Sequence, residues 1–279
     1  MAVYYIDGKF VDESEAVLPV NDLIILRGYG VFDFLRTYNK RPFHLDDHLN
    51  RLRNSARLIG LNCPWSNEEL TGIVTETLAR NSFAESNVRL LITGGDSEDG
   101  ISPAEKPRLV IIISDALAFP AEYYRDGVKI ITARLNRFIP GAKSIDYIRA
   151  IVTLKDAHSA GAIESIYVTE NDHVLEGTTS NLFLVKNGVV VTASEDILPG
   201  ITRDVLLKIL EPEFTIEVRP VLKHELYDTD EAFLASSNKE VMPVVGADDQ
   251  VIADGKPGAV TRRVMSMFRE YTDRYGQGG

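Results

Sequence analysis

The residues best suited to covalent chemistry lie in one stretch of the chain, 139–183. Lys143 follows a Pro-Gly break, Tyr147 comes four residues later, and Glu176 lies in the sequence LEGTTSNLF. An amine can form a Schiff base with a carbonyl cofactor, and a carboxylate can keep a ring nitrogen protonated so that the ring withdraws electrons. A lysine after Pro-Gly is also commonly a solvated surface charge. Spacing alone leaves both interpretations open.

The elements around these residues follow from periodicity and turn signals. Residues 148–160 predict an amphipathic helix that ends at Gly161, and 163–169 predict a strand. Asn187-Gly188 predicts a hairpin turn between two apolar strands. Strands therefore dominate this half of the chain, with helices between them.

This stretch resembles the core of the fold-type IV (class IV) pyridoxal-phosphate enzymes. The family includes branched-chain aminotransferases, D-amino-acid aminotransferases and aminodeoxychorismate lyases, and the resemblance extends over nearly the whole chain. It implies that Lys143 is the catalytic residue and forms the Schiff base with pyridoxal 5'-phosphate. It also implies that Glu176, within the family's EGxxSN pattern, pairs with the pyridine nitrogen, and that Tyr147 donates toward the ring hydroxyl.

Three segments are candidates for holding the cofactor phosphate. Gly200 stands directly before a predicted helix, whose free N–H groups suit an anion; an ordinary junction capped by Thr202 fits the same letters. The resemblance assigns the phosphate to Ile201 and Thr202 there, to Arg51 in an HxxRL…SA pattern on the predicted helix 45–59, and to the hydroxyl of Ser237.

The substrate residues are expected near the N-terminal end. Tyr29, Phe32 and Arg36 match a family stretch in which an aromatic residue flanked by glycine precedes a strand that lines the active site. Arg27 is a candidate carboxylate binder because a guanidinium fork suits that group, although a surface arginine fits equally well. Asn238 falls where a backbone amide often receives the substrate carboxylate, but the Asn-Lys pair here departs from the small residues of the family.

The resemblance implies an α/β (α+β) chain of two domains. We expect a small N-terminal α/β domain over 1–116, an interdomain linker at 117–122, and a larger barrel-like α/β domain that binds the cofactor over 123–279. A capping-box spacing of Ser66 and Glu69 predicts the start of a second helix within the first domain.

Composition excludes several function classes. A net charge of −11 leaves no basic surplus for nucleic acid. The chain has no apolar run of membrane-spanning length and no secretory signal, so we expect no membrane partner.

Cys63 is the one cysteine, which fits a reducing compartment. We expect no metal, a cytoplasmic location, and a homodimer by family resemblance.

The leading functional hypothesis is a transaminase that moves the amino group of a small or hydrophobic amino acid, with the branched-chain type favoured, to a 2-oxo acid such as 2-oxoglutarate. The loop 94–105 carries no Arg-x-His clamp of the kind found in bacterial D-amino-acid enzymes. A D-amino-acid transaminase in which Arg27 replaces that clamp remains an alternative. An aminodeoxychorismate lyase is another, and a non-catalytic relative used for binding is disfavoured by the full set of candidate residues.

Overall fold

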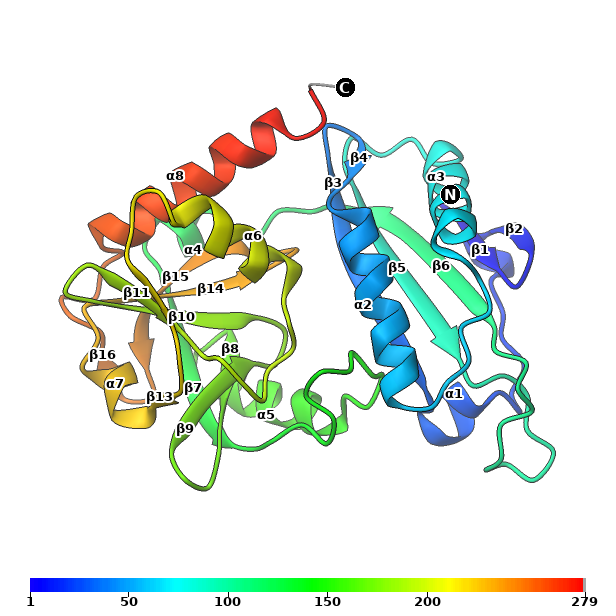
Figure 1. Ribbon diagram of the computed structural model, residues 1–279, viewed down its shortest axis with the longest axis horizontal. Coiled ribbons are helices and arrows are strands. Elements are labelled where there is room, and N and C mark those ends of the chain that lie inside the picture. The colour runs from blue at the N-terminus through cyan, green and yellow to red at the C-terminus, as the bar shows by residue number, and fades with distance from the viewer. Residues whose placement is uncertain (278–279) are drawn as a thin grey trace. The chain divides into compact units, whose positions relative to one another are not determined.

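The computed structural model describes residues 1–277 and divides by tertiary contacts into two units, which are described separately (Figure 1). The first unit holds Met1–Leu117, Gly141–Tyr147 and the chain from Tyr275, and the second holds Ala118–Pro140 and Ile148–Arg274. Unlike the linear division at 117–122, this grouping places Lys143 with the N-terminal unit. The expected second domain also includes residues 278 and 279, which lie outside the described part.

An antiparallel sheet forms the base of the first unit. Within residues 1–277 it has six strands in the order β2-β1-β6-β5-β3-β4. Asp7 and Gly8 have φ angles of 46° and 92°, which a tight hairpin turn requires, and they connect β1 to β2. The strands are β1 (Val3–Ile6), β2 (Lys9–Asp12), β3 (Gly30–Tyr38), β4 (Arg41–Pro42), β5 (Ser86–Thr93) and β6 (Leu109–Asp115).

Helix α2 (Leu45–Leu58) packs on β3 and supplies one side of the first core. Its residues Leu49, Leu52 and Ala56 are fully buried, and the helical spacing that predicted this element is confirmed. The predicted capping box also forms at the start of α3 (Asn67–Ala79). The sequence analysis missed two short elements here, the 3-10 helix η1 (Glu13–Glu15) and α1 (Leu23–Arg27).

The second unit contains a sheet that closes on itself. In the described part it has ten strands: β12-β11-β10-β14-β15-β7-β8-β9-β13 in order, with β16 paired to β15. An additional pairing of β9 with β10, at Glu176 and Asn181, joins six of these strands into a ring. The expected barrel-like domain is therefore confirmed. The strands are β7 (Val128–Arg134), β8 (Glu164–Val168), β9 (His173–Gly177), β10 (Asn181–Lys186), β11 (Val189–Thr192), β12 (Ile216–Val218), β13 (Val221–Leu222), β14 (Glu231–Ser236), β15 (Glu240–Ala247) and β16 (Gln250–Val251).

Helices pack against this sheet. α5 contacts β7 and β8, α6 contacts β14, and α8 contacts β14, β15 and α6. Alternation along β10 and β14 sends Leu182, Leu184 and Leu234 into one core, while Phe183 and Phe233 stack on each other at 4.8 Å on the opposite face. The helices are α4 (Ala121–Arg125), α5 (Ile148–Ser159), α6 (Ile201–Leu210), α7 (Lys223–Tyr227) and α8 (Ala259–Arg274).

Three of these helices were not expected. α4 begins inside the segment predicted as a linker, and α7 was missed. α8 was missed as well, although its Val264 and Phe268 repeat at helical spacing. The other buried positions of α8 are Thr261 and Thr272. Because threonine is polar, the buried face of the helix does not appear as an apolar stripe in the sequence. None of the helices within residues 1–277 is both long enough and apolar enough to cross a membrane.

Replacing Phe268 by alanine tests whether α8 contributes to the stability of the second unit. The side chain is 2% exposed, so truncation leaves a cavity and should lower the free energy of unfolding by about 3–5 kcal/mol. Urea denaturation followed by circular dichroism measures this change. Arg262→Ala, at an exposed position of the same helix, is the control and should change it by no more than about 0.5 kcal/mol. Equal losses in both variants would contradict the packing role.

Candidate active site

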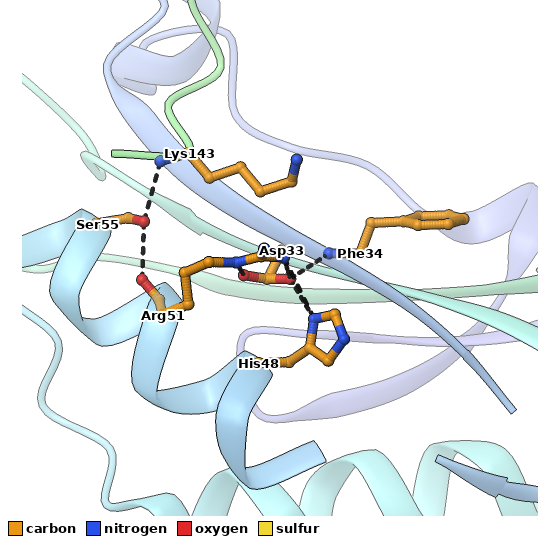
Figure 2. A network of polar contacts seen from close by, with 6 residues as sticks. All are labelled: Asp33, Phe34, His48, Arg51, Ser55 and Lys143. Carbon is orange, nitrogen blue, oxygen red and sulfur yellow. Dashed lines mark hydrogen bonds and ion pairs between the residues drawn. The ribbon is translucent and has the colours of Figure 1, made fainter. Parts of the chain in front are cut away.

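The backbone of Lys143 is fixed on both sides by the first unit. Its N–H donates to Ser55 Oγ at 3.0 Å, and its carbonyl accepts the N–H of Phe32 at 2.9 Å. Ser55 in turn donates to the Arg51 carbonyl at 2.8 Å, so the loop is tied to both α2 and β3 (Figure 2). The amine lies 4.7 Å from the centroid of the Phe32 ring. The lysine is therefore held by its surroundings and is not a loosely solvated loop residue.

Three charged or titratable side chains form a buried cluster beside this loop (Figure 2). Arg51 donates from Nε and Nη2 to the two Asp33 oxygens at 2.9 and 2.8 Å, and His48 Nδ1 lies 2.6 Å from Asp33 Oδ1. Asp33 and His48 are fully buried, and Arg51 is 8% exposed. The bidentate contact orients the guanidinium as well as neutralising the carboxylate.

Titration in this cluster follows from burial and charge. Burial raises the pKa of Asp33, but the Arg51 charge, His48 and their hydrogen bonds outweigh it, so the pKa lies well below its usual range. Burial is the largest influence on His48 and lowers the pKa of its ring, which favours the neutral form. Its Nε2 atom is buried and has no hydrogen-bond partner within residues 1–277.

Two predicted site residues meet at the Phe32 ring. The Tyr147 ring packs edge-on against it, with centroids 5.5 Å apart and an interplanar angle of 66°. Since the Lys143 amine lies over the same ring, Phe32 contacts both of the residues that stand four positions apart in the sequence. Phe32 is 7% exposed, so it packs as a core residue while its ring contacts both candidate site residues.

Arginines and aromatic rings share one face of the sheet formed by β3 and β5. Phe32, Phe34, Arg36 and Tyr38 share this face of β3, with the Arg36 guanidinium 4.7 Å from the Tyr38 centroid. Arg89, opposite Phe34, lies 5.4 Å from the centroids of both Phe32 and Phe34. Sequence reasoning missed Arg89, although it is the charged residue inside an apolar strand.

Arg27 and Tyr29 are placed elsewhere on the first unit. Arg27 is exposed at the end of α1, donates to the Leu26 carbonyl at 2.8 Å, and lies close to Gly100 in the loop 94–105. Tyr29 packs against the first core, and its hydroxyl donates to the Ile59 carbonyl at 3.1 Å. Their assignment to the substrate stays a prediction.

Glu176 is a buried carboxylate at the seam of the second unit's barrel. Its Oε2 accepts the Leu198 N–H at 3.0 Å and the Asn181 amide at 3.4 Å, and its Oε1 lies 3.2 Å from Arg137 Nη1. These donors compensate the charge for its burial. A Cβ on Gly200 would lie 2.0 Å from Asn181 Oδ1, so this position needs glycine for close approach rather than for its φ angle.

The start of α6 presents backbone N–H groups that no side chain caps within the described residues. Ile201 and Thr202 are buried there, and the alternative in which Thr202 caps the helix is not observed. Arg203, which sequence reasoning missed, is also buried. It donates to the Ala193 carbonyl at 2.8 Å, its Nε has no partner within 1–277, and burial lowers the pKa of its guanidinium.

Ser237 and Asn238 occupy the turn between β14 and β15. Ser237 is half-buried, and Asn238 Oδ1 accepts the Ser236 hydroxyl at 3.0 Å. The Asn238 side chain therefore already accepts one hydrogen bond within its own turn. Its predicted contact with substrate stays a prediction.

The buried carboxylate of Glu176 and the start of α6 suit a pyridine ring that carries a phosphate. A buried carboxylate with donor support can pair with a protonated ring nitrogen, and an uncapped helix start with a buried arginine Nε beside it can bind an anion. A lysine amine on a fixed backbone can form a covalent bond to a carbonyl group. Residues 1–277 contain no group of three or more histidine, cysteine or acidic residues placed to hold a metal ion.

Comparison with known proteins identifies the family of this chain. The family described as Amino-transferase class IV matches residues 30–247. A putative branched-chain-amino-acid aminotransferase of Methanocaldococcus jannaschii is 35% identical over 98% of this chain and 97% of that protein. A D-alanine aminotransferase of Bacillus licheniformis is 31% identical over 94% of each.

Solved structures show the same similarity. A branched-chain aminotransferase of Escherichia coli has a TM-score of 0.92 and 27% identity over 99% of this chain and 97% of that one. A second branched-chain aminotransferase, from T.th. and solved with pyridoxamine 5'-phosphate, has a TM-score of 0.93 and 28% identity over 99% of this chain and 96% of that one. The chain therefore belongs to the class IV amino-transferase family and is a pyridoxal-phosphate-dependent aminotransferase.

Proposed function

We propose that the enzyme transfers the amino group of an L-branched-chain amino acid to 2-oxoglutarate. The similarity to the Methanocaldococcus jannaschii protein carries this proposal, since it extends over nearly the full length of both chains. The Phe32 and Phe34 rings beside Arg36 and Arg89 support it, because an apolar side chain and a carboxylate need neighbouring surfaces of this kind.

In this proposal, Lys143 would hold the cofactor through its Nζ atom, and the same amine would take up and return the proton of the substrate Cα. When bound, pyridoxal phosphate supplies an aldehyde that bonds to amines and a cationic ring that withdraws electrons from Cα. The hydrogen bonds from Ser55 and Phe32 fix the lysine backbone, so its amine reaches a limited region.

Other residues hold the cofactor in place. Glu176 would face the ring nitrogen as its hydrogen-bond partner, and the donors Leu198, Asn181 and Arg137 orient that carboxylate. Tyr147 donates toward the ring hydroxyl. The phosphate would be bound by the guanidinium of Arg51 and the hydroxyl of Ser237. The backbone N–H groups of Ile201 and Thr202 at the start of α6 would bind it as well.

The substrate carboxylate has arginine candidates on the first unit. Arg36 and Arg89 belong to the face that carries Phe32, whose ring the Lys143 amine overlies. Tyr29 and Asn238 are the remaining predicted substrate residues. Tyr29 would contact the substrate with its ring, and Asn238 would contact it from the turn between β14 and β15.

A D-amino-acid transaminase is the second candidate, and one observation favours it. Arg27 lies beside the loop 94–105, which holds the position of the Arg-x-His clamp in the resembled D-specific enzymes. The D-alanine aminotransferase relatives, at 29–31% identity, are consistent with this alternative. A lyase on the same scaffold would release pyruvate from aminodeoxychorismate without an amino acceptor.

We also propose a cytoplasmic homodimer. The exposed apolar residues Ile148, Ile151 and Val152 lie in the first turns of α5, and Phe138 is exposed in the loop after β7; a second subunit would remove such residues from water. The single cysteine fits a reducing compartment.

The preference for L- or D-amino acids as amino donors distinguishes the two candidate functions. With 2-oxoglutarate as acceptor, L-leucine should be turned over about tenfold or more faster than D-alanine, since a tenfold preference needs only about 1.4 kcal/mol of differential binding. Measurement of kcat/KM for both enantiomers of leucine, alanine and glutamate checks this. Faster turnover of the D-enantiomers, abolished by Arg27→Ala, would favour the alternative.

Substitution of Lys143 by alanine tests the covalent attachment. Borohydride reduction followed by mass spectrometry should find the cofactor on Lys143 in the wild type and on no lysine in the variant, while the transamination rate falls by about 10²–10⁴-fold or more. Lys155→Ala, at an exposed position, is the control and should retain both. Reduction that labels another lysine in the wild type would refute the assignment.

Asp33→Asn tests the cluster that orients Arg51. Removing one charge from this buried group should lower the free energy of unfolding by about 3–5 kcal/mol at pH 7 and weaken retention of pyridoxal phosphate. Because the folded-state pKa of Asp33 is depressed, its contribution is present above the usual carboxyl pKa and is lost as the pH falls through the acid range.

The stability gap between wild type and Asp33→Asn should therefore narrow below about pH 4 in urea titrations. Asp12→Asn, an exposed position in the same unit, is the control and should show no comparable gap at pH 7. A gap that widens on acidification would contradict the assigned ion pair.

A further inference from the structure

Glu164 places a fully buried carboxylate at the start of β8 that none of the proposed catalytic steps uses. Its Oε1 accepts the Thr179 N–H at 3.1 Å. Its Oε2 accepts the hydroxyls of Thr179 and Ser180, each at 3.1 Å, and lies 2.8 Å from the amine of Lys239. The carboxylate is thus held by one turn of chain and by one distant lysine.

Lys239 is as unusual as its partner, because a lysine is rarely buried without a specific partner. It is 5% exposed, and its amine also donates to Thr179 Oγ1 at 2.5 Å. The same amine lies 5.9 Å from the centroid of the Phe119 ring, and the Lys239 carbonyl accepts the Tyr124 hydroxyl at 3.1 Å. Side chain and backbone are therefore both held in place.

The turn that Glu164 holds is the connection across the barrel seam. Residues 177–180 join Glu176 to Asn181, which pair with each other and close the ring of strands. A Cβ on Gly177 would lie 2.6 Å from Ser180 Oγ and 2.9 Å from Glu164 Cγ, so the turn packs onto the carboxylate without spare room. A shift of the carboxylate must move the turn.

The other end of the ion pair belongs to the turn between β14 and β15. The Lys239 N–H donates to Ser236 Oγ at 3.3 Å, and Ser236 donates to Asn238 Oδ1 at 3.0 Å. Ser237 stands between these two residues. One buried ion pair thus connects the turn next to Glu176 with the turn that carries Ser237.

We propose that Lys239 is a positioning residue, which through Glu164 sets the geometry of two turns that serve the cofactor. The ion pair fixes residues 177–180 and thereby Glu176, and it fixes the backbone beside Ser237. This inference rests on the proposed function of Glu176 and Ser237. Buried ion pairs contribute little net stability compared with apolar replacements, so the role assigned to this one is geometric.

The test compares variants of the full chain titrated with pyridoxal phosphate and followed by visible absorption. Lys239→Met leaves Glu164 buried without its cation, so the Kd for pyridoxal phosphate should rise about tenfold or more, the size seen for residues that orient the ligands of a bound group. The absorption maximum should shift with it. Lys155→Met, at an exposed lysine, is the control and should leave the Kd and the spectrum unchanged.

A double variant separates positioning from simple loss of a side chain. Lys239→Met combined with Glu164→Gln removes both charges, while the glutamine carbonyl can still accept from Thr179 and Ser180. The double variant should bind pyridoxal phosphate more tightly than Lys239→Met alone. Thr179→Val removes the hydroxyl shared by both charged groups and should raise the Kd by about threefold or more, because one hydrogen bond to each charged group is lost.

Several outcomes would overturn the inference. A folded Lys239→Met protein whose Kd and spectrum match the wild type would do so, even if its thermal midpoint without cofactor were lower. Should Lys239→Met not fold, an unchanged Kd in Thr179→Val would have the same meaning. A wild-type chain that binds no pyridoxal phosphate would instead refute the proposed function, on which the inference rests.

Discussion

Burying a carboxylate among strands is costly unless donors surround it, and this constraint determines the geometry of the first unit. Asp33 lies on β3 with no exposure, and it is compensated by Arg51 and His48 from α2. The charge that has to be matched therefore fixes how α2 is rotated about its axis. Because Ser55 on the same helix accepts the Lys143 N–H, the same rotation also fixes the loop that carries the amine.

The second unit meets the same constraint at the seam of its barrel. Glu176 is the point where β9 pairs with β10, so the strand pairing that closes the sheet also places a carboxylate where a backbone N–H, an amide and a guanidinium converge on it. An apolar residue at this seam could close the ring equally well. The observed carboxylate requires Asn181 to face it, and the tight contact of Asn181 with Gly200 in turn sets where α6 begins.

Local signals in the sequence predicted the elements whose determinants lie within a few residues, such as the hairpin at Asn187-Gly188 and the capping box at Ser66. The helix α8 was missed because its buried face includes threonines, which polarity alone assigns to solvent. Long-range pairing explains what the sequence could not reveal about the site. Nothing near Arg89 indicates that it lies against two phenylalanine rings of another strand, and Arg203 reads as an ordinary first-turn charge yet is buried. The grouping of 141–147 with the N-terminal unit likewise arises from backbone contacts that only the folded chain brings within reach.

The Asn-Lys pair after Ser237 shows how a departure from a family pattern should be interpreted. In the sequence, a lysine where small residues are expected suggests a new charge offered to the substrate. The structure gives that charge to Glu164, with the amine 2.8 Å from a carboxylate that is itself fully buried. Because this amine is neutralised by its ion pair, it attracts a substrate anion only weakly. It therefore cannot by itself change which carboxylate the enzyme accepts. In the proposed positioning role, its effect on the reaction passes through the turns it holds. The arginines proposed for the substrate carboxylate, Arg27, Arg36 and Arg89, are then the positions at which differences in substrate choice should be sought.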